Sequence, residues 1–104
     1  MLRFPEIAKA TLPPLYSQEK EKDPIVQAHF FFPGIDYHWF AIEGQQQEEE
    51  FTFFGWVIAP EKELGYFSLQ GMEEVNVAGR TIQFDTAFTP RRLSAVKREY
   101  GGDE

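Results

Sequence analysis

Two runs of the chain, residues 25–32 and 37–42, are rich in β-branched and aromatic residues and flank a Pro33-Gly34 turn signal. This pattern predicts a β-hairpin. Pairing Phe32 with either Ile35 or Tyr37 gives the same parity, that is, it places the same residues on each face of the hairpin. One face is then wholly apolar and carries Val26, Ala28, Phe30, Phe32, Tyr37, Trp39 and Ala41. The other face is mixed and carries Ile25, Gln27, His29, Phe31, His38, Phe40 and Ile42. We expect this mixed face to lie under a helix or to be partly solvated.

The pattern after this hairpin predicts three more strands. Residues 45–50 (QQQEEE) contain no apolar side chain and predict a surface loop between antiparallel strands. Residues 51–59 are nearly continuous in large apolar side chains, as in a central strand that is covered on both faces. Residues 64–69 predict a fourth strand, residues 71–75 a helical turn, residues 77–80 a turn and residues 81–88 an alternating fifth strand.

Helix signals lie near both ends of the chain. Pro13-Pro14 ends any helix that begins earlier, which limits an N-terminal helix to residues 5–11. Thr89-Pro90 has the form of an N-cap followed by proline at the first helical position, and Gly101 is a stop signal. The C-terminal helix is therefore predicted over residues 90–100.

These elements predict an α+β fold. We expect a curved antiparallel sheet of about five strands, with a short N-terminal helix and a C-terminal helix packed on one face. The 104 residues and the 42% apolar share fit a single domain over residues 1–104, with residues 1–4 and 101–104 frayed.

Composition then excludes several classes of protein. The chain has no cysteine, which excludes disulfides, thiolate nucleophiles, iron–sulfur clusters and thiolate zinc sites. No apolar run approaches the length of a membrane span, and the first residues lack the apolar region of a signal peptide, so we expect a cytoplasmic protein that binds no membrane. The net charge of −7 argues against nucleic-acid binding over the whole surface.

Four segments of the chain resemble a bacterial domain family of unknown function that recurs in plasmids, phages and other mobile elements. They are residues 12–19 (LPPLYSQE), 23–26 (DPIV), 52–55 (TFFG) and 63–69 (ELGYFSL), and the similarity spans roughly residues 8–96. The resemblance implies no established activity. It implies a setting in mobile DNA, where small acidic proteins often inhibit host defence systems and small DNA-processing proteins are also common.

His29 and His38 are the best candidates for metal binding or acid–base chemistry. The predicted register places them on one face, directly opposite or one diagonal step apart, with Asp36 near the turn. A catalytic metal usually has three protein ligands, and no third ligand is evident. We therefore expect two histidines without a metal.

No other pattern in the sequence indicates catalysis. The neighbouring glutamates of the polar stretches do not converge on a shielded point, and phosphate-binding loops, nucleophile elbows and zinc-protease motifs are absent from the sequence. The sequence thus favours a protein that is not an enzyme and that uses no cofactor.

Charge and aromatic residues are unevenly distributed. Twelve of the seventeen aromatic residues lie between Phe30 and Phe67, more than a core this small is expected to bury. Residues 23–79 contain ten acidic residues and one basic residue, whereas residues 80–98 contain five basic residues and one acidic residue. The charge pattern alone is also compatible with ordinary surface solubility.

Two functional hypotheses follow. The preferred one is a mobile-element interaction protein whose acidic surface imitates nucleic acid and inhibits a host defence nuclease, of CRISPR or restriction type. Its candidate partner-binding residues are Glu48, Glu49, Glu50, Glu61, Glu63, Trp39, Trp56 and Tyr66. The alternative is a DNA-binding or DNA-processing protein, with or without a metal at His29 and His38. Its nucleic-acid-binding residues would be Arg91, Arg92, Lys97 and Arg98.

Overall fold

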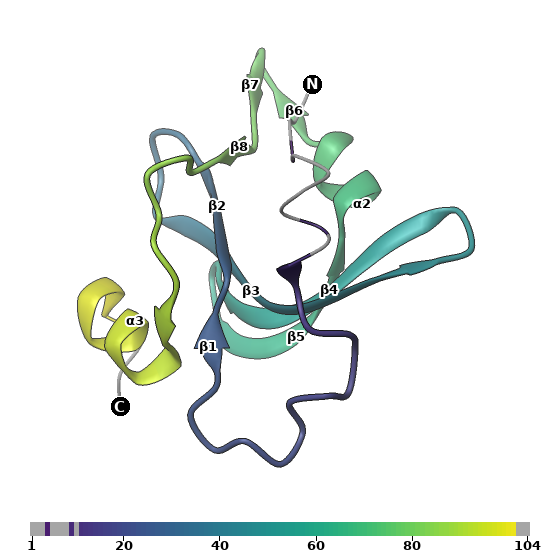
Figure 1. Cartoon of the computed structure of the whole chain (residues 1–104). Coiled ribbons are helices and arrows are strands. Elements are labelled where there is room, and N and C mark those ends of the chain that lie inside the picture. Colours follow the sequence, from purple (N-terminus) through teal and green to yellow (C-terminus); the bar gives the residue numbers. More distant parts are fainter. Residues whose placement is uncertain (1–3, 5–8, 10, 102–104) are drawn as a thin grey trace.

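The computed structural model describes residues 4, 9 and 11–101. The elements are β1 (Ile25–Val26), β2 (Ala28–Phe32), β3 (Tyr37–Gln47), β4 (Glu50–Ile58), β5 (Lys62–Ser68), α2 (Leu69–Glu73), β6 (Asn76–Val77), β7 (Arg80–Thr81), β8 (Gln83–Phe84), β9 (Arg91–Arg92) and α3 (Leu93–Tyr100). Among the described residues, five strands form an open antiparallel sheet in the order β5-β4-β3-β2-β8 (Figure 1). The predicted α+β class is confirmed.

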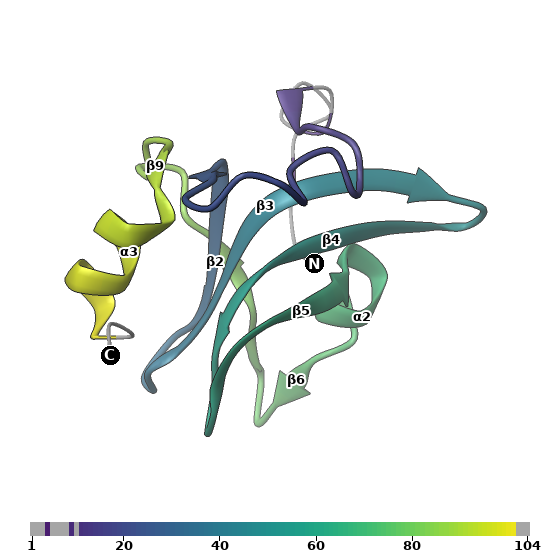
Figure 2. The ribbon, with the colours of Figure 1, turned by 90° about the horizontal axis from the view of Figure 1, so that it is seen from below.

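Both faces of this curved sheet are covered. The first core cluster comprises Phe4, Leu12, Ala28, Phe30, Phe32, Ala41, Phe51, Phe53, Leu69, Met72 and Ile82. The second core cluster comprises Val26, Phe40, Ile42, Trp56, Ile58, Leu93 and Val96. Helix α2 contributes to the first cluster and α3 to the second, so the two helices lie on opposite sides of the sheet (Figure 2).

The register of the first hairpin confirms the predicted parity. Phe32 pairs with Tyr37, and the remaining pairs follow without a shift as far as Ala28 and Ala41. Val26 is the exception, because it belongs to the second cluster and not to the face expected for it. The predicted strand breaks at Gln27, and β1 turns away to pair with β9.

The predicted surface loop over residues 45–50 is wrong. Strand β3 continues to Gln47 and β4 begins at Glu50, so only Glu48 and Glu49 form the turn, with Glu48 in the left-handed region at φ 56°. The hairpin projects beyond the rest of the sheet (Figures 1 and 2), where polar side chains remain exposed on both faces of paired strands. Backbone hydrogen bonds therefore extend β3 and β4 through a segment that buries no apolar face against the core.

Strands β3 and β4 approach unusually closely beside an irregularity in their register. The pairing shifts between Ala41 and Glu43, as in a β-bulge. At Gly55, opposite Ala41, an added Cβ would lie 1.8 Å from the carbonyl oxygen of Phe40. Glycine is required at this position because no side chain fits between the two backbones.

The C-terminal helix begins later than predicted. Helix α3 starts at Leu93, because Arg91–Arg92 pair with β1 as strand β9. Thr89 is not its N-cap. Instead, the carboxylate of Asp23 accepts hydrogen bonds from the backbone N–H of Ser94 at 2.8 Å and from its hydroxyl at 2.7 Å. Gly101, at φ 77°, ends the helix as expected.

The elements between these two regions are also shifted from their predicted positions. Ser68 caps α2 by accepting a hydrogen bond from the N–H of Gly71 at 2.9 Å, so this helix begins two residues before the helical turn predicted over residues 71–75 and overlaps it. The predicted strand over residues 81–88 is reduced to β7 and β8, which are interrupted at Ile82.

Part of the N-terminal prediction lies outside the described residues. This applies to most of the helix expected over residues 5–11 and to the frayed ends, apart from Phe4 and Gly101. Phe4 is buried against the rings of Phe30 and Phe53, contrary to fraying at that position. Among the described residues, no helix has the length and apolar character needed to cross a membrane.

Candidate binding cleft

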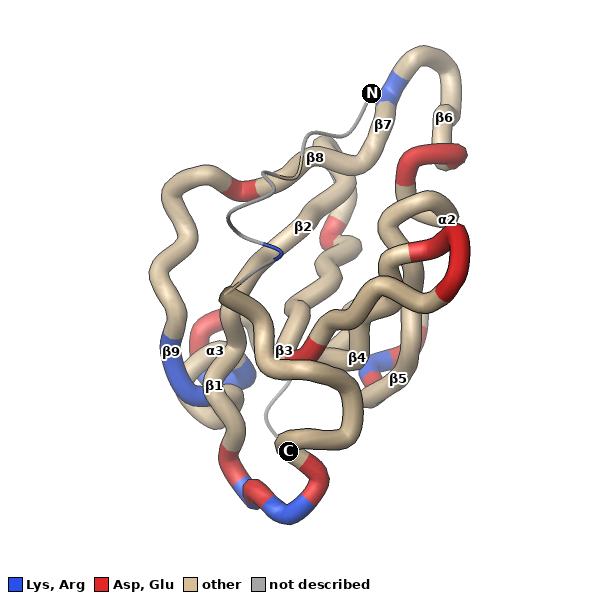
Figure 3. Tube along the Cα trace, turned by 45° about the vertical axis from the view of Figure 1, so that its right-hand side comes forward, with Lys and Arg blue, Asp and Glu red and all other residues tan. Residues whose placement is uncertain are grey.

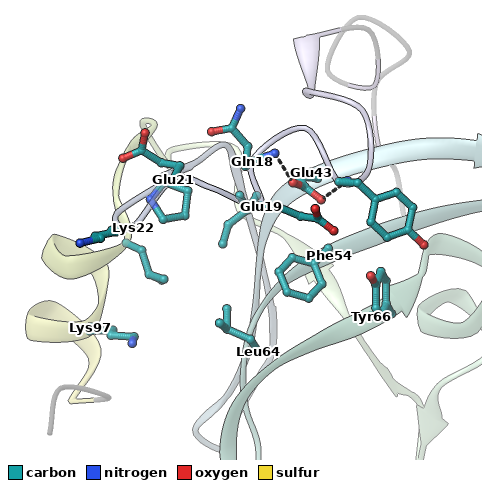
Figure 4. Close-up of a pocket in the computed structure, with 13 residues that line it drawn as sticks. Gln18, Glu19, Glu21, Lys22, Glu43, Phe54, Leu64, Tyr66 and Lys97 are labelled. Atoms are coloured by element: carbon teal, nitrogen blue, oxygen red, sulfur yellow. Dashed lines mark hydrogen bonds between the residues drawn. The ribbon is translucent and has the colours of Figure 1, made fainter.

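A cleft of about 330 Å³ lies between the loop that precedes β1, strands β3 to β5 and helix α3 (Figure 4). Its lining residues are Tyr16, Gln18, Glu19, Glu21, Lys22, Pro24, Ile42, Glu43, Phe54, Leu64, Tyr66, Leu93 and Lys97. The sequence segments that meet here are far apart along the chain, and the curved sheet together with the loop brings them together.

One end of the cleft is aromatic. The rings of Phe54 and Tyr66 lie 4.9 Å apart, and those of Tyr16 and Tyr66 lie 6.4 Å apart, both at a tilt of 58°. Tyr16 and Tyr66 are each 57% exposed and Leu64 is 48% exposed. Large apolar side chains that stay in water at one place indicate a surface for binding a partner.

Glu43 fixes the loop that carries Tyr16. Its side chain is buried, and its two carboxylate oxygens accept hydrogen bonds from the backbone N–H groups of Tyr16 at 2.8 Å and Gln18 at 2.7 Å. Tyr16 has a φ of 71°, a left-handed conformation that is costly for a residue with a side chain. The buried carboxylate therefore holds the loop in a strained shape that presents Tyr16 to the cleft.

The aromatic end is also negative. The pKa of the Tyr66 phenol is raised, first by its hydrogen-bonding interaction with Tyr16, then by partial burial, and further by the charges of Glu43 and Glu19. Figure 4 places Lys22 and Lys97 at the opposite end of the cleft from Tyr66. The arrangement can receive a cation at one end, where aromatic faces and carboxylates act together.

Two tryptophans predicted to bind a partner are not exposed. Trp56 is 7% exposed and belongs to the second core cluster, and the ammonium of Lys97 lies 4.3 Å from its ring centre. Trp39 is half-buried and packs against the first core cluster. With this burial, Trp56 does not offer its ring to a partner, contrary to the prediction, because it packs against apolar residues of the second core cluster.

The five predicted glutamates do not form one surface. Glu48, Glu49 and Glu50 lie at the tip of the β3–β4 hairpin, whereas Glu61 and Glu63 lie at the far end of β4 and the start of β5. At about 3.3 Å per residue, the length of β4 separates the two groups by roughly 26 Å. Of the residues predicted to bind a partner, only Tyr66 lines the cleft.

The histidine pair forms a chain of hydrogen bonds with two aspartates. Asp85 Oδ2 lies 2.8 Å from His29 Nδ1, His29 Nε2 lies 2.8 Å from His38 Nδ1, and His38 Nε2 lies 2.8 Å from Asp36 Oδ1. The two histidines are diagonal neighbours, as the predicted register allows, since His29 pairs with Phe40 and His38 with Phe31.

Proton counting limits what this chain can do. Carboxylates only accept hydrogen bonds, so His29 Nδ1 and His38 Nε2 donate to the two aspartates. The two ring nitrogens that face each other cannot both carry a proton without losing the hydrogen bond between the rings. Burial lowers the pKa of His29, although its hydrogen bond to Asp85 acts in the opposite direction.

The same geometry does not assemble a metal centre. A metal held by both histidines would need His29 Nε2 and His38 Nδ1 to point toward it, but these two nitrogens point toward each other. Among the described residues, no three His, Cys, Asp or Glu side chains are grouped so that they could hold one.

Most of the candidate nucleic-acid-binding residues are engaged within the chain. The Arg91 guanidinium donates to Glu99 Oε1 at 2.7 and 3.0 Å, and Arg92 donates to the carbonyl of Asp23 at 2.8 Å. Lys97 lies over Trp56. Arg98 is exposed. Arg91 and Arg92 form β9 and Lys97 and Arg98 lie on α3, where Figure 3 shows basic segments beside acidic ones. Arg80, from the same basic stretch of sequence, lies apart from them on β7.

Sequence reasoning named Tyr66 but missed the other residues of the aromatic end, including Tyr16, Glu19, Glu43 and Phe54. No local signal marks Glu43, which directly follows the apolar residues 40–42 and precedes Gly44 and the polar residues 45–50. Its partner, the backbone of the loop at Tyr16, depends on tertiary structure. Comparison with protein-family models, with curated proteins and with solved structures finds no match to this chain.

Proposed function

We propose that this protein is a non-enzymatic binding module that receives a basic side chain of a protein partner in the cleft. One observation carries the proposal. Among the described residues, five large hydrophobic side chains are exposed, and three of them, Tyr16, Leu64 and Tyr66, line this cleft. Core packing does not account for such a concentration, whereas partner binding does.

The chemistry of the aromatic end favours an arginine or lysine as the group received. A guanidinium or ammonium is attracted to the faces of aromatic rings, and the attraction increases where carboxylates stand beside them. Glu19 and Glu43 act on Tyr66 in this way. The strained loop at Tyr16 supports the same conclusion, since backbone strain is often retained at ligand clamps.

The resemblance to a mobile-element family suggests the biological form of this function. In that form, the basic side chain belongs to the nucleic-acid channel of a host defence nuclease in the cytoplasm, and the protein inhibits the nuclease by occupying the channel. The exposed glutamates at the two ends of β4 add long-range attraction to such a channel, which weakens as salt rises. The cleft, and not the five glutamates together, supplies the specific contact.

The test uses N-acetylarginine N-methylamide, which carries one guanidinium and almost no backbone. Titration followed by NMR should give saturable shifts at Tyr66 and Phe54, with a Kd of about 1 mM, the range of a single weakly bound side chain. Tyr66→Ala should weaken binding about fivefold, the loss expected for one cation–π contact. Glu19→Gln should weaken it in the same direction.

Two controls keep this test specific. Val77→Ala removes another exposed apolar side chain, 61% exposed and away from the cleft, and should leave the affinity unchanged. N-acetylcitrulline N-methylamide has the same shape without the charge and should not saturate. Equal binding of the neutral compound, or shifts that map elsewhere, would refute the proposed function.

A further inference from the structure

We infer that the partner segment binds as an extended strand added to the outer edge of β5, with its basic residue opposite Tyr66. This inference rests on the proposed function and specifies how the partner lies. Strand β5 is one end of the sheet order β5-β4-β3-β2-β8, so among the described residues it has a neighbour on one side only. An edge strand presents unpaired N–H and C=O groups on its outer side.

The two edges of the sheet differ in a way that identifies β5 as the binding edge. Strand β8 at the other edge has two residues, whereas β5 has seven and pairs with β4 through seven consecutive positions without a register shift. Natural sheets usually protect such edges with proline, bulges, short strands or charged side chains, especially lysine. Along β5 only the first two residues, Lys62 and Glu63, are charged, and residues 64–68 carry no charge, proline or register shift.

The side chains of β5 connect this edge with the cleft. Successive residues of a strand point to opposite faces, so Leu64 and Tyr66 share one face, and both line the cleft. A strand added beside β5 would place every second side chain over this face. A residue opposite Tyr66 would reach the aromatic end, and a residue two positions away would contact Leu64.

Charge indicates the chemistry of this strand. The groups at Tyr66 are the carboxylates of Glu43 and Glu19, and Glu63 is exposed on the other face of the edge. Lys62 is the basic residue of β5, and its ammonium donates to the carbonyl of Gly101 at 2.8 Å. The edge therefore favours a segment with a basic residue opposite Tyr66 and an aliphatic one opposite Leu64. Recognition of this type combines main-chain hydrogen bonds with side-chain pockets at alternate positions.

The test uses an acetylated and amidated hexapeptide in which valine, arginine and valine alternate with threonines. It should bind at least tenfold more tightly than N-acetylarginine N-methylamide, because it adds backbone hydrogen bonds. Methylating the backbone nitrogens of the peptide one at a time should then affect binding at every second residue. Methylation of a nitrogen that points toward β5 should weaken binding at least tenfold, and methylation of a nitrogen that points away from β5 should change it less than twofold. The β5 amides should exchange more slowly with solvent when the peptide is bound.

The results separate this inference from the function on which it rests. Equal effects of methylation at neighbouring peptide residues, or no slowing of amide exchange in β5, would overturn strand addition even if N-acetylarginine N-methylamide still bound at Tyr66. Failure of the single arginine together with a period of two in the hexapeptide would instead refute the proposed side-chain recognition alone. A concentration-dependent dimer that Leu64→Lys abolishes would overturn the inference by assigning the edge to a second copy of the chain.

Discussion

At the scale of the residue, the paired histidines have the most defined chemistry in the fold. His29 is 4% exposed and stacks at 4.6 Å on Phe40, while its two nitrogens contact Asp85 and His38. Protonation of both rings would place two N–H groups against each other and break the central hydrogen bond. The folded state therefore resists full protonation of this pair, and the unfolded chain does not.

This resistance predicts a loss of stability on mild acidification. The pKa of His29 lies below its ordinary value of 6.5 when the chain is folded, so the unfolded chain binds more protons as the pH falls through this range. Its contribution to stability is complete above about pH 6.5 and is lost as the pH falls through the folded pKa. The charged and titratable groups around His29 are Asp85, His38, Arg91 and Tyr100.

Urea unfolding at pH 7.5 and pH 5.5 measures this effect. The free energy of unfolding should be lower at pH 5.5, and His29→Gln should reduce the difference. The pKa of Asp85 is also lowered, because hydrogen bonds from His29 and Ala87 outweigh its burial. That group loses its contribution only near and below its ordinary value of 3.8, outside this window. A pH dependence that His29→Gln leaves intact would contradict the explanation.

At the scale of the element, local patterns predicted the β2–β3 hairpin, because strand parity and a Pro33-Gly34 turn are local properties. They failed at the β3–β4 hairpin, where paired backbones extend a polar segment that has no apolar face. They failed also at α3, whose cap comes from Asp23, far away in sequence. Within the candidate site, Tyr66 could be named from its aromatic character, but its neighbours Tyr16 and Glu43 meet only through the folded loop.

The long-range cap of α3 gives a prediction at this scale. Asp23→Ala removes the acceptor of two hydrogen bonds from Ser94 and should lower the thermal unfolding midpoint by a measurable amount. The pKa of Asp23 is lowered, chiefly by these hydrogen bonds. The difference between the variant and the natural chain should therefore shrink as the pH falls through the folded pKa of Asp23.

Thr89→Ala is the matched control, since Thr89 is the N-cap that the sequence predicts. In the structure its hydroxyl oxygen accepts a hydrogen bond from Arg91 at 3.2 Å, and α3 begins four residues later. This variant should change the unfolding midpoint little. If Thr89→Ala destabilised the protein and Asp23→Ala did not, the result would support Thr89 as the cap of α3 and refute Asp23.

At the scale of the whole molecule, the net charge is −7, and both arginines of β9 stand beside carboxylates. Glu99 pairs with Arg91, and Glu21 lies 3.7 Å from Arg92, so carboxylates stand among the cations of β9 and α3. The glutamates of the hairpin tip and of the β4–β5 turn are exposed. The field of the molecule therefore attracts positive surfaces and repels a polyanion.

The last prediction follows from this field and separates the proposed function from DNA binding. At low micromolar protein and about 0.15 M salt, neither single-stranded nor double-stranded DNA should show a gel shift, because ordinary non-specific affinity of 10⁻⁴ to 10⁻⁶ M needs several unpaired cations on one face. Arg98→Glu is the best probe, since Arg98 is exposed and reversal of Arg91 would also break its ion pair with Glu99. A DNA complex that forms at this salt and disappears with Arg98→Glu would favour a DNA-processing protein. If no gel shift forms and the arginine compound binds at Tyr66, the cleft would be the site at which the protein recognises its partner.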